Sequence, residues 1–285
     1  MSNLKEIIAA KVFFLSTIAS AVMILAIFGF MIVLAIPIFR AGNFTAIWTG
    51  PWAPQEGLYG IWPMISGTLW IALLATALCL PLSLGTSFVI TSLGGLHLRK
   101  VLGTLVRFMT GIPTVIYGFV GVFLLVPLVR EGIGGAGMCV LTTGMMLAVL
   151  ISPTMILFFT DSLLAVDSSY VQAAKALGAN RIQRLLYVRV PGAKGGMVAG
   201  IILALGRALG DTLIALMLAG NAIQVPHAVL EPARTLTAHI ALVKAADFDS
   251  LEFRSIFACG IVLYLFAATS TVAVRRMLRK KEVSF

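Results

Sequence analysis

Six long apolar runs are separated along the chain by shorter polar or glycine-rich segments. A membrane-spanning helix needs roughly 20 mainly apolar residues, and each run meets that length. The runs extend approximately over Val12 to Phe39, Pro63 to Thr91, Leu105 to Val129, Gly137 to Thr160, Met197 to Ala219 and Ile256 to Val274. They are continuously apolar rather than alternating, which excludes a lipid-facing barrel. The pattern predicts an all-α integral membrane protein with six transmembrane helices.

The composition agrees with a membrane protein, because 60% of the 285 residues are hydrophobic and only 11% are charged. We divide the chain into residues 1–62, an N-terminal transmembrane helix with an outer loop, residues 63–274, a five-helix transmembrane domain, and residues 275–285, a basic tail. The first apolar run is about twice as long as the core of a signal peptide and no small-residue cleavage site follows it. We therefore expect this run to remain as a helix.

The positive charges are distributed unequally between the two sides that six spans would define. Fifteen of the 21 Lys and Arg residues fall on the side that also holds both termini, and five fall on the other side. By the positive-inside rule, both termini are predicted to be cytoplasmic. The chain is then a multi-pass protein of the cytoplasmic (inner) membrane, with membrane lipid as a partner. The net charge of +10 is thus a topology signal, and nucleic acid is not an expected partner.

Prolines interrupt the second, third and fourth apolar runs at Pro81, Pro113 and Pro153. Each removes a backbone donor and crowds the preceding turn, so kinks are expected. Pro113 lies in "GIPTVIYGFVG", where Gly111 and Gly118 permit close helix approach. Two interpretations remain open for Pro113: tight packing, or a helix hinge that lines a pore.

The loop at about 161–196 contains "DSSYVQAAKALGANRIQRLLYVRVP", which predicts two short helices joined at a bend. Ser168 or Ser169 can cap the first helix and Gly178 can end it, while Asn180 can cap the second and Pro191 lies just past its end. The second helix is amphipathic. It could lie on anionic lipid headgroups, or the pair could dock a soluble partner.

This loop resembles the coupling loop of bacterial type I ABC importer permeases, in which Glu-Ala-Ala, a Gly four residues later and a terminal Pro stand at the same spacing. Ala173, Ala174, Gly178 and Pro191 match that pattern, whereas Gln172 replaces the usual Glu. The resemblance implies that these five residues couple the membrane helices to a separate ATPase subunit. It also implies that any ion pair of the usual Glu is lost here.

A narrower resemblance joins three further stretches, "GTLWIALLATALCLPLSLG", "GIPTVIYGFVGVFLLVP" and "LGRALGDTLIALMLAGN". Together they are similar to the phosphate-importer permeases of PstC type, which usually have Glu where this chain has Asp211. This resemblance implies import of inorganic phosphate. It further implies a second permease subunit of PstA type, ATPase subunits and an external phosphate-binding protein as partners.

The chain carries no catalytic motif of its own. No Gly-Lys pair occurs, so a phosphate-binding nucleotide loop is excluded and ATP hydrolysis is expected on another chain. His97, His227 and His239 are isolated from one another and from Cys79, Cys139 and Cys259. We expect neither an enzyme, nor a cofactor, nor a metal site.

Arg207 and Asp211 are two opposite charges inside the fifth apolar run. Each costs roughly 2.5 to 3.5 kcal/mol at the centre of a span, so their helix needs a face shielded from lipid by protein. On a continuous helix they lie one turn apart on one face and can pair directly. Either the pair only holds helices in register, or Arg207 and Asp211 line the transport pathway and meet an oxyanion.

The combined prediction is the permease subunit of an ATP-driven phosphate importer. Three alternatives remain: a permease for another oxyanion such as molybdate or sulfate on the same scaffold, an ion-coupled secondary transporter, and a sensory or scaffolding membrane subunit. A secondary transporter often contains an inverted repeat, and none is visible in the sequence.

Overall fold

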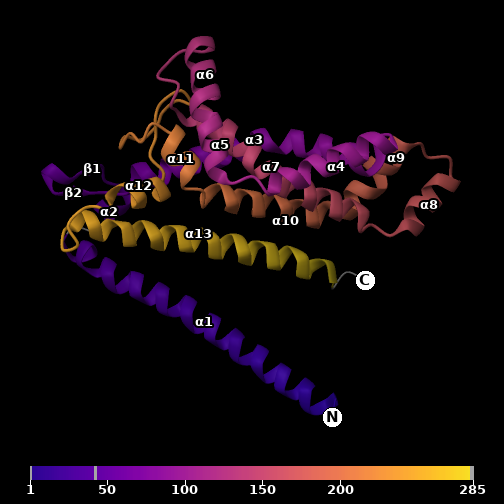
Figure 1. Ribbon diagram of the computed structural model, residues 1–285, viewed down its shortest axis with the longest axis horizontal. Coiled ribbons are helices and arrows are strands. Elements are labelled where there is room, and N and C mark those ends of the chain that lie inside the picture. The colour runs from indigo at the N-terminus through magenta and orange to yellow at the C-terminus, as the bar shows by residue number, and fades with distance from the viewer. Residues whose placement is uncertain (1, 42–43, 283–285) are drawn as a thin grey trace.

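The computed structural model describes residues 2–41 and 44–282 and is almost entirely helical (Figure 1). The helices are α1 (Ser2–Ala41), α2 (Phe44–Thr49), α3 (Trp62–Phe88), α4 (Leu96–Thr110), α5 (Thr114–Val120), α6 (Val126–Gly132), α7 (Val140–Leu164), α8 (Ser168–Ala176), α9 (Arg181–Arg184), α10 (Val190–Leu209), α11 (Leu213–Leu218), α12 (Leu236–Val243) and α13 (Leu251–Glu282). Three single π-helical turns, η2 (Val89–Leu93), η3 (Gly121–Leu125) and η4 (Leu185–Arg189), continue or join these helices, and η1 (Pro54–Glu56) is a 3-10 turn. The strands β1 (Trp52–Ala53) and β2 (Leu58–Tyr59) form a small antiparallel hairpin that pairs Trp52 with Tyr59.

Six helical segments in the described residues are long and apolar enough to cross a membrane, which confirms the predicted number. They are Glu6–Arg40, Trp62–Leu93, Thr114–Gly132, Val140–Leu164, Arg181–Leu209 and Leu251–Arg276. The last of them belongs to α13, which continues as a helix through most of the predicted basic tail. Residues 283–285 of that tail lie outside the described residues.

Helix α7 is the centre of the main core. In its most apolar stretch 72% of the residues are buried inside the chain, against 11% for α1, so α7 is surrounded by protein. It packs against α3 and α10, where small residues allow close approach: a Cβ on Gly144 would meet the Leu74 side chain at 2.9 Å, and one on Gly200 would meet Phe158 at 2.8 Å. Such small-residue contacts are the usual way in which membrane helices associate.

A second, smaller core joins the end of α1 to α12 and α13. Ile38, Trp52, Ile61, Leu236 and Cys259 are among its buried members. Trp52 stacks edge-on against His239 with 4.4 Å between ring centres. This core ties the long α1–α13 pair to the start of α3.

The two described chain ends and the helices α8 and α9 lie at one end of the molecule (Figure 1). The β1–β2 hairpin, α2 and α12 lie at the opposite end, and α1 diverges from the bundle toward its N-terminus (Figure 1). This arrangement agrees with an even number of crossings.

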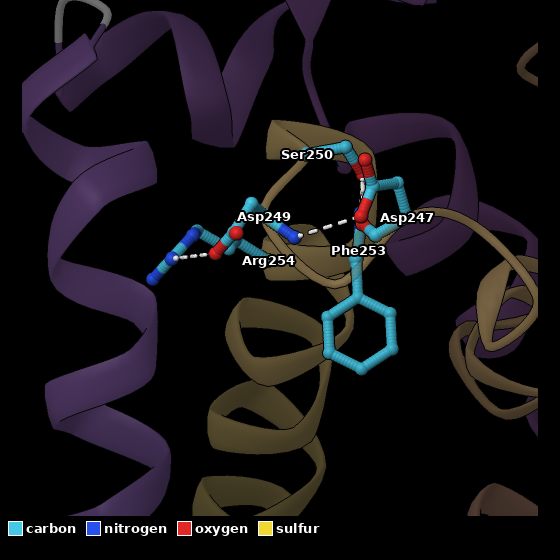
Figure 2. Close-up of polar contacts among 5 residues, drawn as sticks. All are labelled: Asp247, Asp249, Ser250, Phe253 and Arg254. Carbon is cyan, nitrogen blue, oxygen red and sulfur yellow. Dashed lines mark hydrogen bonds and ion pairs between the residues drawn. The ribbon is translucent and has the colours of Figure 1, made fainter.

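The loop before α13 is held by short polar contacts (Figure 2). The backbone N–H of Phe253 donates to Ser250 Oγ over 3.1 Å, which caps the first turn of α13. Arg254 reaches back to Asp249 at 3.4 Å, and Asp249 N–H donates to Asp247 Oδ1 (Figure 2).

Two predicted spans differ from the structure. The third, expected from Leu105 as one helix, is interrupted at residues 111–113, and the residues before the break belong to the separate helix α4, which already begins at Leu96. The fifth, expected from Met197 to Ala219, is helical from Arg181 onward and breaks after Leu209. Proline and glycine explain the first break, and glycine followed by a capping aspartate explains the second.

Candidate functional site

The break between α10 and α11 contains the two charges that the sequence singles out. Gly210 ends α10, and its N–H still bonds to the carbonyl of Gly206 at 3.2 Å. Asp211 Oδ1 then accepts the backbone N–H of Ile214 at 2.9 Å, which caps the start of α11. Thr237 fixes the same point from α12, since its hydroxyl donates to the Asp211 carbonyl at 2.8 Å.

Arg207 lies in the last turn of α10 with an exposed side chain. Its Nη1 donates to Thr154 Oγ1 of α7 at 3.2 Å. A guanidinium carries five donors, so this one bond leaves most of them available. Thr154 follows Pro153 in α7. Because Pro153 has no N–H, the Val149 carbonyl lacks its usual helical donor, and the Ser152 hydroxyl donates to it instead.

Of the two alternatives for Arg207 and Asp211, the direct ion pair is not formed. Among the described residues, the one ion pair within 4.0 Å joins Arg254 to Asp249. The continuous helix on which the prediction rested ends at Leu209, and the Asp211 carboxylate caps the next helix instead of pairing with Arg207. Arg207 therefore forms no ion pair within 4.0 Å among the described side chains, although it lies close enough to Asp211 to interact with it electrostatically.

The sequence holds a signal for this break that the hydropathy pattern conceals. Gly210 followed by Asp211 and Thr212 combines a helix-ending glycine with residues that favour an N-cap. Thr154 is the contact of Arg207 that sequence reasoning does not identify, because 53 residues separate the two.

Pro113 does not kink a continuous helix. It precedes α5 with an extended backbone, at φ −59° and ψ 138°, and thus stands in the linker between α4 and α5. Tyr117, one turn into α5, donates its hydroxyl to the Met109 carbonyl across the linker at 3.1 Å. Pro81 and Pro153, by contrast, lie inside α3 and α7.

The predicted helix pair of the loop is present as α8 and α9. Gly178 ends α8 in a left-handed conformation with φ +85°, and the N–H groups of Gly178 and Ala179 bond to the carbonyls of Lys175 and Ala174. This is a Schellman motif, for which glycine is the favoured residue. Asn180 and Gln183 then form a reciprocal capping box at the start of α9, as the position of Asn180 predicts.

Two details of the loop differ from the prediction. Asp167, rather than Ser168 or Ser169, caps α8 by accepting the Ser169 N–H at 2.8 Å, and this bond holds the pKa of the Asp167 carboxyl below its usual range. Pro191 does not follow the end of a helix, because η4 and α10 continue α9 without interruption. Proline is tolerated there as one of the first residues of α10.

The surface of this loop is unusually apolar for a segment between spans. Large hydrophobic side chains stand exposed on α8, the bend and the following turns, at Tyr170, Leu177, Ile182, Leu186 and Tyr187. The side chain at the tip of the bend, Leu177, is 89% exposed. Gln172, Ala173 and Gly178 are also exposed. Clustered apolar exposure of this kind marks an interaction surface.

A metal site is not formed by the described residues, among which no three His, Cys, Asp or Glu side chains gather. Cys79, Cys139 and Cys259 are free and buried. The predicted site residues Arg207 and Asp211 lie at the break after α10, and those around Gly178 lie in the loop. Helix α10 connects these two groups.

Comparison with known proteins places these features in one family. Residues 84–283 match the family described as binding-protein-dependent transport system inner membrane component. The phosphate transport system permease protein PstC of Pasteurella multocida is 30% identical over 260 residues, which cover 84% of this chain and 81% of that protein. The probable ABC transporter permease protein YqgH of Bacillus subtilis is 28% identical over 236 residues, covering 81% and 76% of the two chains.

Solved structures agree on the fold. A chain of the MetNI methionine ABC transporter in an inward-facing conformation superposes with a TM-score of 0.57 at 17% identity, covering 79% of this chain and 98% of that one. A chain of an amino acid ABC transporter gives 0.54 at 16% identity, with 75% and 94% covered. The bundle is thus that of type I importer permeases.

Proposed function

Because the chain belongs to the family of binding-protein-dependent transport system inner membrane components, we propose that it is the permease subunit of an ATP-driven importer that carries inorganic phosphate across the cytoplasmic membrane. The observation that carries the phosphate assignment is Arg207, an exposed guanidinium with one neutral hydrogen-bond partner and no ion pair within 4.0 Å among the described side chains. A planar fork of donors matches the oxygens of a tetrahedral oxyanion. The similarity to PstC proteins of several bacteria supports phosphate as that anion.

Asp211 borders the same proposed pathway and favours hydrogenphosphate over sulfate. One of its oxygens caps α11, and a carboxylate retains further acceptor positions for a proton-bearing oxyanion. Hydrogenphosphate can donate such a proton at neutral pH, whereas sulfate has none and meets only repulsion. Because Arg207 and Asp211 form no direct ion pair, both side chains would be available to the cargo.

The partners follow from this assignment. We propose that the loop from Gln172 to Pro191, with its exposed apolar side chains, docks on an ATPase subunit and transmits nucleotide-driven closure through the continuous helix of α9, η4 and α10. A second permease subunit of PstA type would cover the exposed face that carries Arg207. An external phosphate-binding protein would deliver the cargo, and both termini, with α8, would face the cytoplasm.

Removing the Arg207 guanidinium tests the assignment. In the importer purified with its partners and reconstituted into vesicles, Arg207→Gln should lower ATP-dependent uptake of radiolabelled phosphate at least about tenfold, the value of one charge-assisted hydrogen bond. Lys194→Gln, which removes one exposed cation from the same helix, is the matched control and should retain uptake.

Several outcomes would contradict parts of the proposal. Undiminished uptake by an assembled Arg207→Gln importer removes Arg207 from the pathway. Stronger uptake of sulfate or molybdate than of phosphate replaces the cargo, and uptake without ATP favours an ion-coupled transporter. Asp211→Asn retains an acceptor for the Ile214 N–H, so a loss of uptake in that variant assigns a role to the carboxylate charge beyond capping.

A further inference from the structure

A second cationic site lies away from Arg207, at the end of the molecule that carries α8 and α9. Four arginines, Arg99, Arg181, Arg184 and Arg189, line one pocket of about 270 Å³ together with Thr91, Ser92 and Val171. No carboxylate belongs to this lining. The pocket is thus a concave surface with four positive charges and none of the opposite sign.

The arginines come from two separate parts of the chain. Arg99 is in the first turn of α4, Arg181 and Arg184 are in α9, and Arg189 ends η4. Arg99 and Arg184 lie close enough to Arg189 to repel it electrostatically. A fold that holds like charges together in this way is stabilised when an anion joins them.

Most of the donors of these guanidiniums have no protein acceptor among the described residues. Arg99 Nε donates to the Gly94 carbonyl at 2.8 Å, and Arg184 Nε has a long bond of 3.4 Å to Asn180. Arg189 Nη1 donates to the Thr91 carbonyl and to Ser92 Oγ at 3.2 and 3.3 Å. None of the four takes part in an ion pair with any side chain that the structure describes.

The protein bonds nevertheless fix the positions of the charges. Arg189 is anchored to the Thr91 carbonyl and the Ser92 hydroxyl of η2, and Arg99 to the carbonyl of Gly94 directly after η2, so two guanidiniums are held at this end of α3. Several guanidiniums with a hydroxyl in one small polar pocket form a typical binding site for a phosphate group. The volume suits one phosphate and its first waters rather than a nucleotide.

We propose that this pocket, bounded by η2, α4, α8 and α9, binds one phosphate group and thereby ties the end of α3 to the loop that carries α8 and α9. The same chemistry has two sources, inorganic phosphate from the aqueous phase and the headgroup of an anionic phospholipid. The site is distinct from the proposed cargo site, because it lies on another part of the chain and uses none of the residues near Arg207.

The test measures binding rather than transport. The importer, purified through a tag on this chain, is placed in nanodiscs of phosphatidylcholine, and hydrogen exchange is followed in the peptides that contain η2, α4 and α9. Inorganic phosphate should slow exchange in these peptides, whereas chloride at equal ionic strength should not. In a second arm without free phosphate, nanodiscs that contain phosphatidic acid should slow the same peptides if the lipid is the source.

Adjacent cations on α4 provide matched variants. Arg99→Gln should raise the half-saturating phosphate concentration about tenfold. Lys100→Gln, which removes an exposed charge outside the pocket, should leave that concentration unchanged. Arg184→Gln should have the same effect as Arg99→Gln. It leaves the bond from Arg99 to the Gly94 carbonyl in place, so loss of that bond would not explain the effect. The response should persist in Arg207→Gln, which separates this site from the cargo pathway.

The proposal is overturned if neither phosphate nor phosphatidic acid slows exchange in these peptides. It is equally overturned if chloride acts as strongly as phosphate, or if Lys100→Gln weakens the response as much as Arg99→Gln and Arg184→Gln do. A failure of phosphate uptake with a retained exchange response would reject the proposed cargo and leave this pocket in place.

Discussion

At the scale of single residues, His239 is a buried imidazole in the smaller core. Its Nε2 lies 3.2 Å from Ser255 Oγ, and because that hydroxyl donates to the Glu252 carbonyl, Nε2 carries the proton and donates. Nδ1 has no partner among the described residues. Burial, with a smaller contribution from Arg234, lowers the pKa of His239 from 6.5 to about 3, so the folded chain holds it neutral.

This pKa difference predicts a pH-dependent stability. The unfolded chain takes up a proton near pH 6.5 and the folded chain only near pH 3. The contribution of His239 is therefore fully present above about pH 6.5, and the free energy of unfolding falls by about 1.4 kcal/mol for each pH unit below it. Thermal unfolding in detergent from about pH 7.5 to 5 measures this slope. His239→Gln keeps a donor for Ser255 and should flatten it; parallel curves for the two proteins would refute the assignment.

Gly67 and Gly85 in α3 offer a matched pair for backbone packing. A Cβ on Gly67 would lie 2.5 Å from the Arg234 carbonyl oxygen, and backbone cannot yield as a flexible side chain would. Gly67→Ala should lower the free energy of unfolding by roughly 1 to 3 kcal/mol. A Cβ on Gly85 would meet no atom within 4 Å, so Gly85→Ala should be neutral or stabilise by up to about 1 kcal/mol. Equal thermal midpoints for the two variants would contradict the close approach.

At the scale of elements, the bend between α8 and α9 depends on the left-handed Gly178. No atom lies within 4 Å of a Cβ at this position, so a substitution acts through the backbone and not through a clash. Gly178→Val should distort the bend and uncouple ATP hydrolysis from uptake, because a β-branched residue is strained there. Gly178→Asn, which tolerates this conformation, should stay coupled.

The readout for Gly178 is the ratio of phosphate carried to ATP hydrolysed by the purified importer. If Gly178→Val leaves complex formation, stimulated hydrolysis and this ratio unchanged, the loop is not the docking element.

The helices themselves could be predicted well from local pattern. Apolar length indicated the six spans, and Gly178 with Asn180 indicated the α8–α9 bend, since glycine and capping residues act within a few positions of themselves. The break at Asp211 was missed because hydropathy averages over a window in which one glycine and one aspartate weigh little. The contacts of Arg207 with Thr154 and of Arg189 with Thr91 span 53 and 98 positions, and such contacts follow from packing that no local pattern specifies.

At the scale of the whole molecule, α1 stands apart from the rest of the bundle. Its most apolar stretch is 11% buried, it packs on α13, and it lies outside the residues that match the family. Exposed residues such as Phe13, Phe14 and Met23 cover its length. In the membrane this surface meets lipid or another subunit.

The arrangement of the two ends in Figure 1 predicts a labelling pattern. Glu56 in the β1–β2 hairpin and Lys175 in α8 are exposed at opposite ends, and the three native cysteines are buried. In intact cells a membrane-impermeant maleimide should label Glu56→Cys and should label Lys175→Cys only after permeabilisation. The reverse pattern would invert the proposed orientation, and labelling of both in intact cells would refute opposite sides.

The π turns η2 and η4 meet through the bond from Arg189 to the Thr91 carbonyl. A π turn wraps one residue more than an α turn, and one residue of an α-helix corresponds to about 100° of rotation. Rewinding η4 as an α turn would therefore rotate α9 by about 100° against α10. A change of η4 from the π to the α form would thus alter the angle between the segment that carries α8 and the part of α10 that carries Arg207.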